Sequence, residues 1–475
     1  MSVPDSSRGG RRPARDADAR AVAFALLERV ESSGAYADLA LRAALAHSAL
    51  DARDRAFATE LGYGTLRWRG HLDFLLGRVL DRPLERLEPR VRTLLRLGAY
   101  QLAFCDRVPD AAAVSESVRL AHAVGLGRAA GLVNAALRRL ARERGAIEPP
   151  SLEADPLAHL VCARSIPRWI AERWIRDYGV AEAAALASAS NAPPPRTVRA
   201  NRTRTTRDDL LAELRARFPE AAPCRFAADG VTLGRRGDPA ADPAFTEGRM
   251  TVQDEASQLV VELLDPQPGE RVLDACAAPG AKATAIAERI GARGDVLALD
   301  RHARRLGLVA RDAARLGLAN VRTAVADASD VDAEALRGEP AFDRILVDAP
   351  CSGLGALRRN PDARWRVQPE AIGQLAELQR SILAASLPRL RRGGTLVYST
   401  CTLSPEENEQ VIDWLRTRAA ETGIELRNPR ELRELRADAL AAPLRALVEP
   451  DGALRCWPQR HDADGFYAAR LERAS

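Results

Sequence analysis

Apolar residues recur every three or four positions between residues 20 and 143, which is the spacing of amphipathic α-helices. The pattern opens at residues 21–27 and continues through a series of leucines and valines: Leu61, Leu66, Leu72, Leu75, Leu76, Val91, Leu94, Leu95, Leu97 and Leu102. No alternating strand pattern interrupts it. We therefore predict an all-helical domain over residues 19–145, of ordinary domain size.

The second region, residues 146–247, mixes helix and strand patterns. Residues 144–155 contain Pro149 and Pro150 and read as a linker, and a helical segment follows before the proline run at 193–195. Residues 197–201 and 230–233 have strand patterns, and 208–218 has that of an amphipathic helix. This predicts a small α/β module. Arginines cluster around its first strand, and they either grip RNA phosphates or form an exposed charged face: Arg196, Arg199, Arg202, Arg204 and Arg207.

From residue 248 to 475 strand and helix patterns alternate. The predicted strands are residues 271–274, 295–300, 321–327, 345–348 and 395–399, with a closing strand at 464–467 and a helix over 372–390. Such alternation is typical of a doubly wound, mostly parallel sheet. Ligands of such a sheet bind at the carboxyl ends of its strands.

The composition favours a globular intracellular protein. No run of about 18 apolar residues predicts a membrane span. The polar, Arg-rich start, residues 1–18, predicts a flexible tail rather than a secretory signal, and hence a cytoplasmic location. Seven scattered cysteines without a Cys-x-x-Cys pair predict neither a disulfide framework nor a metal site. We also expect a monomer.

One cation stands apart from all the others. Of the 70 Lys and Arg residues only Lys282 is a lysine, and it ends the turn 274–282. A lysine retained in such a chain indicates a task for a compact ammonium group, although chance placement is the alternative. The net charge of +5 and the pI near 9.0 suit an anionic partner, but an Arg-rich surface explains them equally well.

Acidic residues end four of the predicted strands: Asp274, Asp300, Asp327 and Asp348. A single aspartate there is usually a helix cap, but four converging at one crevice indicate a site. The turn after Asp274 lacks the Gly-x-Gly-x-x-Gly pattern of dinucleotide sites, which disfavours a dehydrogenase. Asp300 suits ribose hydroxyls and Asp327 an adenine edge. This arrangement predicts S-adenosylmethionine as the cofactor.

Two cysteines flank the same crevice. Cys351 follows the strand ending at Asp348, and Cys401 follows residues 398–400. A lone buried cysteine is usually a small apolar residue. Two beside an aspartate and the sole lysine instead indicate a thiolate nucleophile that opens a pyrimidine ring. The other cysteines lack such a setting, except that Cys276 is expected to line the cofactor turn.

Three motifs resemble those of the RNA cytosine-5 methyltransferases. They are Asp-x-Cys-Ala-Ala-Pro-Gly at 274–280, Asp-Ala-Pro-Cys-Ser-Gly at 348–353, and Tyr-Ser-Thr-Cys-Thr at 398–402 followed by Glu-Glu-Asn-Glu at 406–409. Residues 112–118 and 131–139 resemble the NusB-like RNA-binding fold. Together they resemble the RsmB/Sun type, which methylates 16S rRNA; that family usually has Gly and Thr where Ala281 and Ala283 stand.

This resemblance implies a Rossmann-like methyltransferase domain with defined residue roles. Cys401 would attack carbon 6 of a cytosine, Asp348 would hold the base, Cys351 would help release the product, and Lys282 would bind the methionyl carboxylate or a base oxygen. The residues expected to hold S-adenosylmethionine are Cys276, Ala277, Ala278, Pro279, Gly280, Ala281, Lys282, Asp300, Asp327 and Asp348.

A loop after Cys351 interleaves cations with an aromatic ring. Arg358, Arg359, Arg364, Trp365 and Arg366 would stack on and neutralise the 16S rRNA substrate, although Trp365 could equally be a packing anchor. Two other functions stay open. One is methylation of tRNA or another rRNA site, and the other is a noncatalytic ribosome-assembly factor with a degenerate methyltransferase domain.

Overall fold

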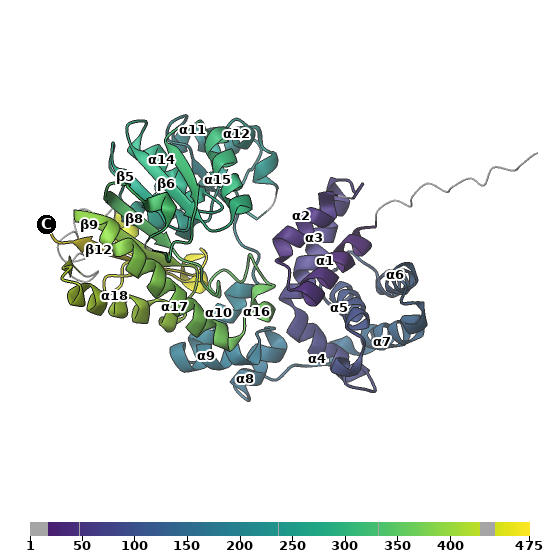
Figure 1. Ribbon diagram of the computed structural model, residues 1–475. Helices are drawn as coiled ribbons and strands as arrows, with labels where there is room; N and C mark the ends of the chain where they lie inside the picture. Colours follow the sequence, from purple (N-terminus) through teal and green to yellow (C-terminus); the bar gives the residue numbers. More distant parts are fainter. Residues whose placement is uncertain (1–17, 47, 236, 331, 428–441) are drawn as a thin grey trace, which may run out of the picture. The chain divides into compact units, whose positions relative to one another are not determined.

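The computed structural model describes residues 18–46, 48–235, 237–330, 332–427 and 442–475 (Figure 1). These residues form two compact units. The first contains the described residues up to Ala187 together with Asn360–Arg366, and the second contains Ser188–Arg359 and the described residues from Val367 onward. The predicted tail lies outside the described residues except for Asp18, and the predicted domain boundaries at 145 and 247 stay predictions. Among the described helices, none is long and apolar enough to cross a membrane.

The first unit is helical throughout its described residues. Its main helices are α1 (Ala19–Ser33), α2 (Ala37–Ala46), α3 (Ala52–Arg67), α4 (Arg69–Val79), α5 (Pro89–Phe104), α6 (Asp110–Ala123) and α7 (Ala130–Glu143). Further along are α8 (Pro156–Ala158), α9 (Arg168–Tyr178), α10 (Val180–Asn191), which runs into the second unit, and the short α16 (Ala363–Arg366). Asp18 and Asp51 cap α1 and α3, and Leu26, Leu61 and Leu94 are fully buried in the shared core. The predicted all-helical domain is confirmed.

The second unit starts with a small antiparallel sheet in the order β2-β3-β1-β4. Its elements are β1 (Thr197–Ala200), α11 (Arg207–Leu214), β2 (Ala222–Pro223), β3 (Gly230–Thr232), α12 (Pro243–Thr246) and β4 (Met250–Val252). Val198 and Val231 are paired across β1 and β3 and fully buried against α11. The sequence predicted β1, β3 and α11; the two- and three-residue strands β2 and β4 were missed.

The main sheet of the second unit runs β10-β12-β9-β8-β5-β6-β7, with β11 paired to β12. Its strands are β5 (Arg271–Asp274), β6 (Asp295–Asp300), β7 (Val321–Val325), β8 (Phe342–Asp348), β9 (Leu390–Thr400), β10 (Leu426–Arg427), β11 (Leu454–Cys456) and β12 (Phe466–Arg473). Strands β5, β6, β7, β8 and β9 run parallel to one another. Strands β10, β11 and β12 pair antiparallel. The predicted mostly parallel sheet with a closing C-terminal strand is confirmed.

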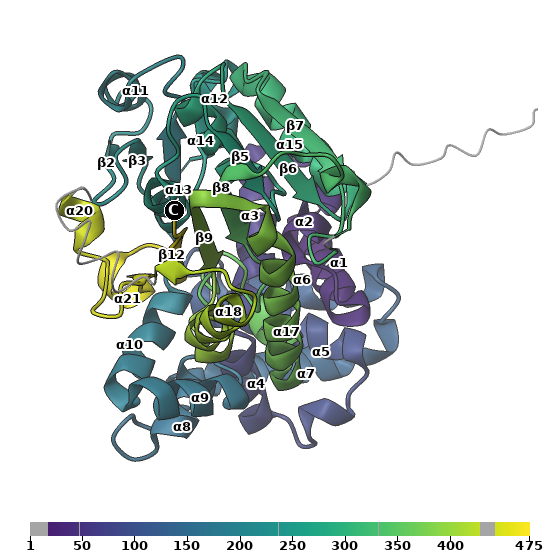
Figure 2. The same cartoon turned by 60° about the vertical axis from the view of Figure 1, so that its left-hand side comes forward.

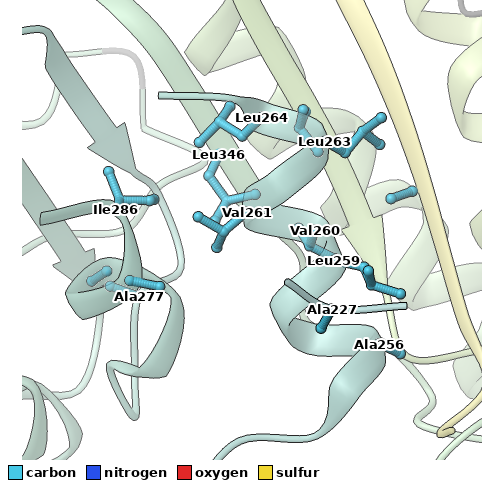
Figure 3. Packing of buried hydrophobic residues seen from close by; sticks show 14 of the residues in the cluster. Ala227, Ala256, Leu259, Val260, Val261, Leu263, Leu264, Ala277, Ile286 and Leu346 are labelled. Carbon is cyan, nitrogen blue, oxygen red and sulfur yellow. The ribbon is translucent and has the colours of Figure 1, made fainter. Parts of the chain in front are cut away.

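Helices cover both faces of this sheet because its strands are apolar on both sides. Leu346 and Val397 point into a core with α13 (Glu255–Leu264), α14 (Ala281–Ile290) and α15 (Ala303–Leu316). Their neighbours Ile345 and Leu396 point into the opposite core with α17 (Pro369–Ser386) and α18 (Glu409–Glu421). Figures 1 and 2 show these two helical layers, and Figure 3 shows α13 packing toward Leu346.

Two further α-helices of the second unit lie among its described residues near the C-terminus, α20 (Ala442–Arg445) and α21 (Pro458–His461).

Candidate active site

The turn after β5 requires a glycine at one position. Gly280 has a φ of +118°, and a Cβ placed on it would lie 3.0 Å from the Cα of Val309 on α15. Only glycine fits both the backbone angle and this approach. Ala281, which begins α14, does not have a positive φ, so its methyl group causes no backbone strain. No side chain caps the N-terminus of α14, which leaves that helix end suited to an anionic group.

Asp274 is a buried carboxylate at the end of β5. It is 1% exposed, and among the described residues its oxygens find no hydrogen bond of good geometry; the backbone of Cys276 offers a weak one that lowers its pKa. Burial, followed by the nearby charge of Asp348, raises the pKa of Asp274 to about 7, while Lys282 opposes the shift. Such a group needs a cationic or donating partner, which is what a cofactor with an ammonium group offers.

Lys282 and Asp348 form an ion pair beside this turn. Lys282 Nζ lies 2.7 Å from Asp348 Oδ2, and Ser399 Oγ donates to Asp348 Oδ1 at 2.8 Å. The Lys282 ammonium also lies over the ring of Phe466, 5.1 Å from its centroid. Lys282 is nearly buried, whereas Asp348 is about one-quarter exposed at 28%. The carboxylate is therefore held from one side and open on the other. The sequence did not single out Ser399 or Phe466, although both lie in segments that it marked.

Asp300 and Asp327 lie at or near the ends of the next two strands. Asp300 is buried at the end of β6, accepts from the backbone of His302 at 2.8 Å and lies 3.6 Å from Arg305 Nη1. Arg305 also donates to the carbonyl of Ala278 in the glycine turn at 3.0 Å. Strand β7 ends at Val325, two residues earlier than predicted. Asp327 is consequently exposed in a turn, where hydrogen bonds from Ser329 lower its pKa.

Cys351 and Cys401 are adjacent, as the strand register requires. Asp348 pairs with Ser399 in the parallel β8–β9 ladder, so the residues that follow each strand end emerge side by side. The two Sγ atoms are 3.4 Å apart. The hydrogen bond with Cys401, followed by burial, raises the pKa of Cys351 well above its ordinary value. Cys351 is therefore a neutral thiol at neutral pH and can donate its proton toward Cys401.

The arginine loop after Cys351 differs from its prediction. Arg358 is 1% exposed and forms ion pairs with Asp464 at 3.0 Å and with Asp462 at 2.8 Å. Arg364 is fully buried in the first unit and donates to the carbonyl of Ser165. A guanidinium buried in this way cannot reach an RNA phosphate, so the predicted RNA contact is wrong for these two residues.

The other residues of that loop are also engaged within the protein. Arg359 bridges Asp254 and Asp464. Trp365 donates its indole N–H to the carbonyl of Leu66 at 2.6 Å, which is the packing role that the sequence left open. Arg366 lies over the ring of Tyr36, 4.0 Å from its centroid.

Arg199 fits neither of the two alternatives that the sequence left open for its arginine cluster, RNA phosphate contact or an exposed charged face. It is 3% exposed and pairs with Glu288 of α14 at 2.7 Å, while its Nη1 donates to the carbonyl of Ala281 at 2.8 Å. Arg199 thus fixes the small sheet to the first turn of α14. The neighbouring Arg202 pairs with Asp229 and stays half-exposed.

These residues fit S-adenosylmethionine by their chemistry. The buried carboxylate of Asp274 lacks a hydrogen bond of good geometry and suits the methionyl ammonium group, the uncapped end of α14 suits the carboxylate, and Asp300 suits the ribose hydroxyls. The glycine at position 280 lets this turn pack against Val309 of α15, which fixes where α14 begins.

Three family models match the chain. The model described as 16S rRNA methyltransferase RsmB/F matches residues 261–472, the NusB family matches residues 17–142, and the RsmF/B-like ferredoxin-like domain matches residues 166–238. These matches confirm the predicted NusB-like, small α/β and methyltransferase parts of the chain.

Curated relatives match over nearly the whole length. The probable ribosomal RNA small subunit methyltransferase B of Bacillus subtilis strain 168 is 36% identical over 456 residues, 96% of this chain and 98% of its own. Ribosomal RNA small subunit methyltransferase B of Pseudomonas putida is 38% identical over 422 residues, 89% of this chain and 91% of its own.

Solved structures share the fold. The structure of PH0851 superposes with a TM-score of 0.78 at 24% identity, covering 96% of this chain and 99% of that one. A methyltransferase homolog protein from Pyrococcus horikoshii gives a TM-score of 0.55 at 28% identity, covering 67% of this chain and 99% of that one.

Proposed function

Because the chain belongs to the RsmB/F family of 16S rRNA methyltransferases, we propose that it methylates carbon 5 of a cytosine in 16S rRNA with S-adenosylmethionine as methyl donor. The observation that carries the proposal is the pair of thiols 3.4 Å apart beside the Asp348–Lys282 ion pair. A pyrimidine ring needs a nucleophile at carbon 6 before carbon 5 can accept a methyl group, and this crevice holds one.

S-adenosylmethionine supplies the electrophilic methyl group when it is bound. The residues proposed to hold it are the turn 276–281, the buried Asp274, the ribose-facing Asp300 and the exposed Asp327. The negative charge of Asp274 would bind the ammonium group of the cofactor's methionyl part, and the positive end of the α14 dipole would bind its carboxylate.

The chain's own residues perform the addition step. The Cys401 thiolate adds to carbon 6, which forms a carbon–sulfur bond and makes carbon 5 electron-rich. Asp348 accepts a hydrogen bond from the exocyclic amine through its open side, and it accepts a second from N3 once N3 takes up a proton from solvent during the addition; Ser399 and Lys282 keep the carboxylate in place. The Lys282 ammonium offsets the negative charge that the ring gains.

Cys351 serves the release step. After methyl transfer, carbon 5 loses its proton to solvent and the carbon–sulfur bond to Cys401 breaks. The neutral Cys351 thiol then donates to the departing Cys401 sulfur, since its raised pKa keeps the proton on Cys351 until a thiolate appears beside it. The target cytosine must be unstacked to enter the site.

The cysteine variants test this proposal. Bisulfite sequencing of total RNA from cells lacking the protein should show one 16S rRNA cytosine unprotected, and the wild-type gene should restore protection. Cys401→Ala should not restore it, whereas Cys351→Ala should accumulate a covalent protein–RNA adduct on denaturing gels. Cys105→Ala, at a thiol in the helical unit, is the control and should behave as wild type. An adduct in Cys401→Ala instead would reverse the two roles, and unchanged bisulfite patterns in the deletion strain would refute the function.

A further inference from the structure

The residues on both sides of Cys351 are held by buried hydrogen bonds. The carbonyl of Pro350 accepts from Gln379 Nε2 at 2.9 Å. The backbone N–H of Ser352 donates to Glu407 Oε1 at 2.8 Å, and its hydroxyl donates to Glu407 Oε2 at 2.6 Å. One carboxylate therefore grips the residue that follows Cys351 at two points, which fixes the direction in which Cys351 leaves the strand end.

The Cys401 segment is held by Asn408, the residue that follows Glu407. Thr400 donates to Asn408 Oδ1 at 2.6 Å, and Asn408 Nδ2 donates to the carbonyl of Thr402 at 3.1 Å. The two segments meet where the hydroxyls of Ser352 and Thr402 lie 2.8 Å apart. Glu407 is thus the main contact of the Cys351 segment and also interacts with Thr402, whereas Asn408 holds the Cys401 segment at Thr400 and Thr402.

The burial of the Glu407 carboxylate is unfavourable for the stability of the fold. It is fully buried, and among the described residues no cation lies within ion-pairing distance of its carboxylate. Burial raises its pKa, and the hydrogen bonds from Ser352 and Gln379 oppose the shift. A buried carboxylate without a counterion stabilises a fold poorly, so its three donors point to a use other than stability.

We propose that Glu407 is a positioning residue that holds Cys351 against Cys401 for the release step. The inference rests on the proposed cytosine-5 reaction. Because Asn408 and strand β9 still hold the Cys401 segment when Glu407 is altered, loss of the Glu407 hydrogen bonds should affect addition to the base less than product release. Among the described contacts, no hydrogen bond joins Glu407 to either sulfur; it positions Cys351 through Ser352, and its charge adds to the raised pKa of Cys351.

Glu407→Gln tests this with little change in volume. The amide offers one acceptor oxygen to three donors, so the two-point grip on Ser352 is lost. On 16S rRNA transcribed with ordinary cytidine, we expect product formation to fall about tenfold and the covalent adduct to rise by a similar factor, the effect of one charged hydrogen bond. Glu370→Gln, at an exposed glutamate of α17, is the matched control and should match wild type.

A second RNA substrate distinguishes a positioning role of Glu407 from a role in folding. In 16S rRNA transcribed with 5-fluorocytidine, the fluorine at carbon 5 cannot leave as a cation, so the adduct persists whether or not release is assisted. Glu407→Gln should trap this RNA within about twofold of the wild-type yield. A parallel loss of adduct on both RNAs would make Glu407 purely structural, and wild-type turnover on ordinary RNA would give it no role; either result overturns the inference.

Two further outcomes are distinguishable. If wild-type protein traps no fluorinated RNA, the proposed reaction itself fails, whatever the variant does. If Glu407→Gln does not fold, Ser352→Ala removes only the hydroxyl contacts to Glu407 and Thr402. That variant should accumulate adduct on ordinary RNA in the same direction with a smaller increase, and an adduct level equal to wild type would count against the inference.

Discussion

Two parts of the second unit differ in how well their side-chain positions follow from the sequence: the strand ends, and two arginines, Arg199 on β1 and Arg358 in the loop after Cys351. At the strand ends, Asp348, Cys351 and Cys401 lie together as the sequence predicted. Among the arginines weighed for RNA contact, Arg199 and Arg358 lie inside the protein with carboxylate partners. Both sets were chosen by residue type, so residue type alone does not explain the difference.

The difference comes from how each position is constrained. A residue at the end of a parallel strand has its place set by the hydrogen-bond ladder and the apolar alternation before it. Arg358 lies in a loop and has no such register; Arg199 has a register on β1, but the register does not determine which group its long side chain reaches. In a chain with one lysine, arginine also performs every structural task of a cation, including the buried ion pairs that its planar, multiply donating group suits.

The largest expected effect concerns the one cation at a strand-end site. Lys282→Arg keeps the charge, but a guanidinium does not fit the nearly buried 2.7 Å contact with Asp348 beneath Phe466 without displacing the carboxylate. A displacement of about 1 Å at a reacting base lowers kcat/KM by on the order of 100-fold. Methyl transfer from labelled S-adenosylmethionine to 16S rRNA measures the change.

Arg311→Lys, a cation exchange on the exposed face of α15, is the control and should keep wild-type activity. Normal methylation by Lys282→Arg would mean that a chance of composition explains the lone lysine.

A smaller effect should follow from removing a loop arginine. Arg358→Ala removes one of the two arginines that pair with the buried Asp464 and leaves Arg359 in place, so it should cost about 3 kcal/mol of unfolding free energy, the low end of the range for a broken buried pair. RNA affinity of the folded variant should stay unchanged, because Arg358 is not exposed. Urea unfolding and RNA binding on the same samples measure both quantities.

Arg235→Ala is the matched control. Arg235 pairs with Asp462 on the surface, with 45% and 58% of the two side chains exposed, so its loss should cost less than about 1 kcal/mol. Weakened RNA binding by folded Arg358→Ala, with stability retained, would restore the phosphate-binding role and remove the contrast between the two regions.

Most of the fold could be predicted from the sequence because its elements carry strong local patterns. The parallel strands β5, β6 and β8 are continuous apolar runs ending in aspartate, and the helical unit has a regular apolar repeat. The strand ends then determine which site residues meet. The short strands β2 and β4 carry too few residues for a pattern to emerge.

The sequence did not predict which residues the polar and aromatic side chains contact within the protein. Glu407 stands in a motif with three other polar residues, and nothing in that motif says which one turns inward to Ser352. Likewise Trp365 follows cations in a pattern typical of RNA-binding loops, yet its indole binds Leu66 of a distant helix. Such contacts join residues far apart in the chain, which neither periodicity nor propensity encodes.

The smallest expected effect concerns the free energy that the ionised, buried Asp274 takes from the stability of the fold. The pKa of Asp274 is about 7 in the folded protein, compared with 3.8 for an unperturbed aspartate, so its contribution to stability is fully present below pH 3.8 and declines as pH rises toward 7. Between pH 5 and pH 7 this group should lower the unfolding free energy by about 2 kcal/mol. The charged groups that face Asp274 are Asp348, Asp300 and Lys282, and all three are present in both the wild type and Asp274→Asn. The difference between the two stability curves therefore isolates Asp274: the Asn variant should lose less stability over that range, whereas the exposed Asp332→Asn should follow the wild type. Parallel curves for Asp274→Asn and wild type would mean that ionising this carboxylate does not lower the stability of the fold. Asp274 would then be as well compensated as the buried Arg199 and Arg358, whose charges have carboxylate partners.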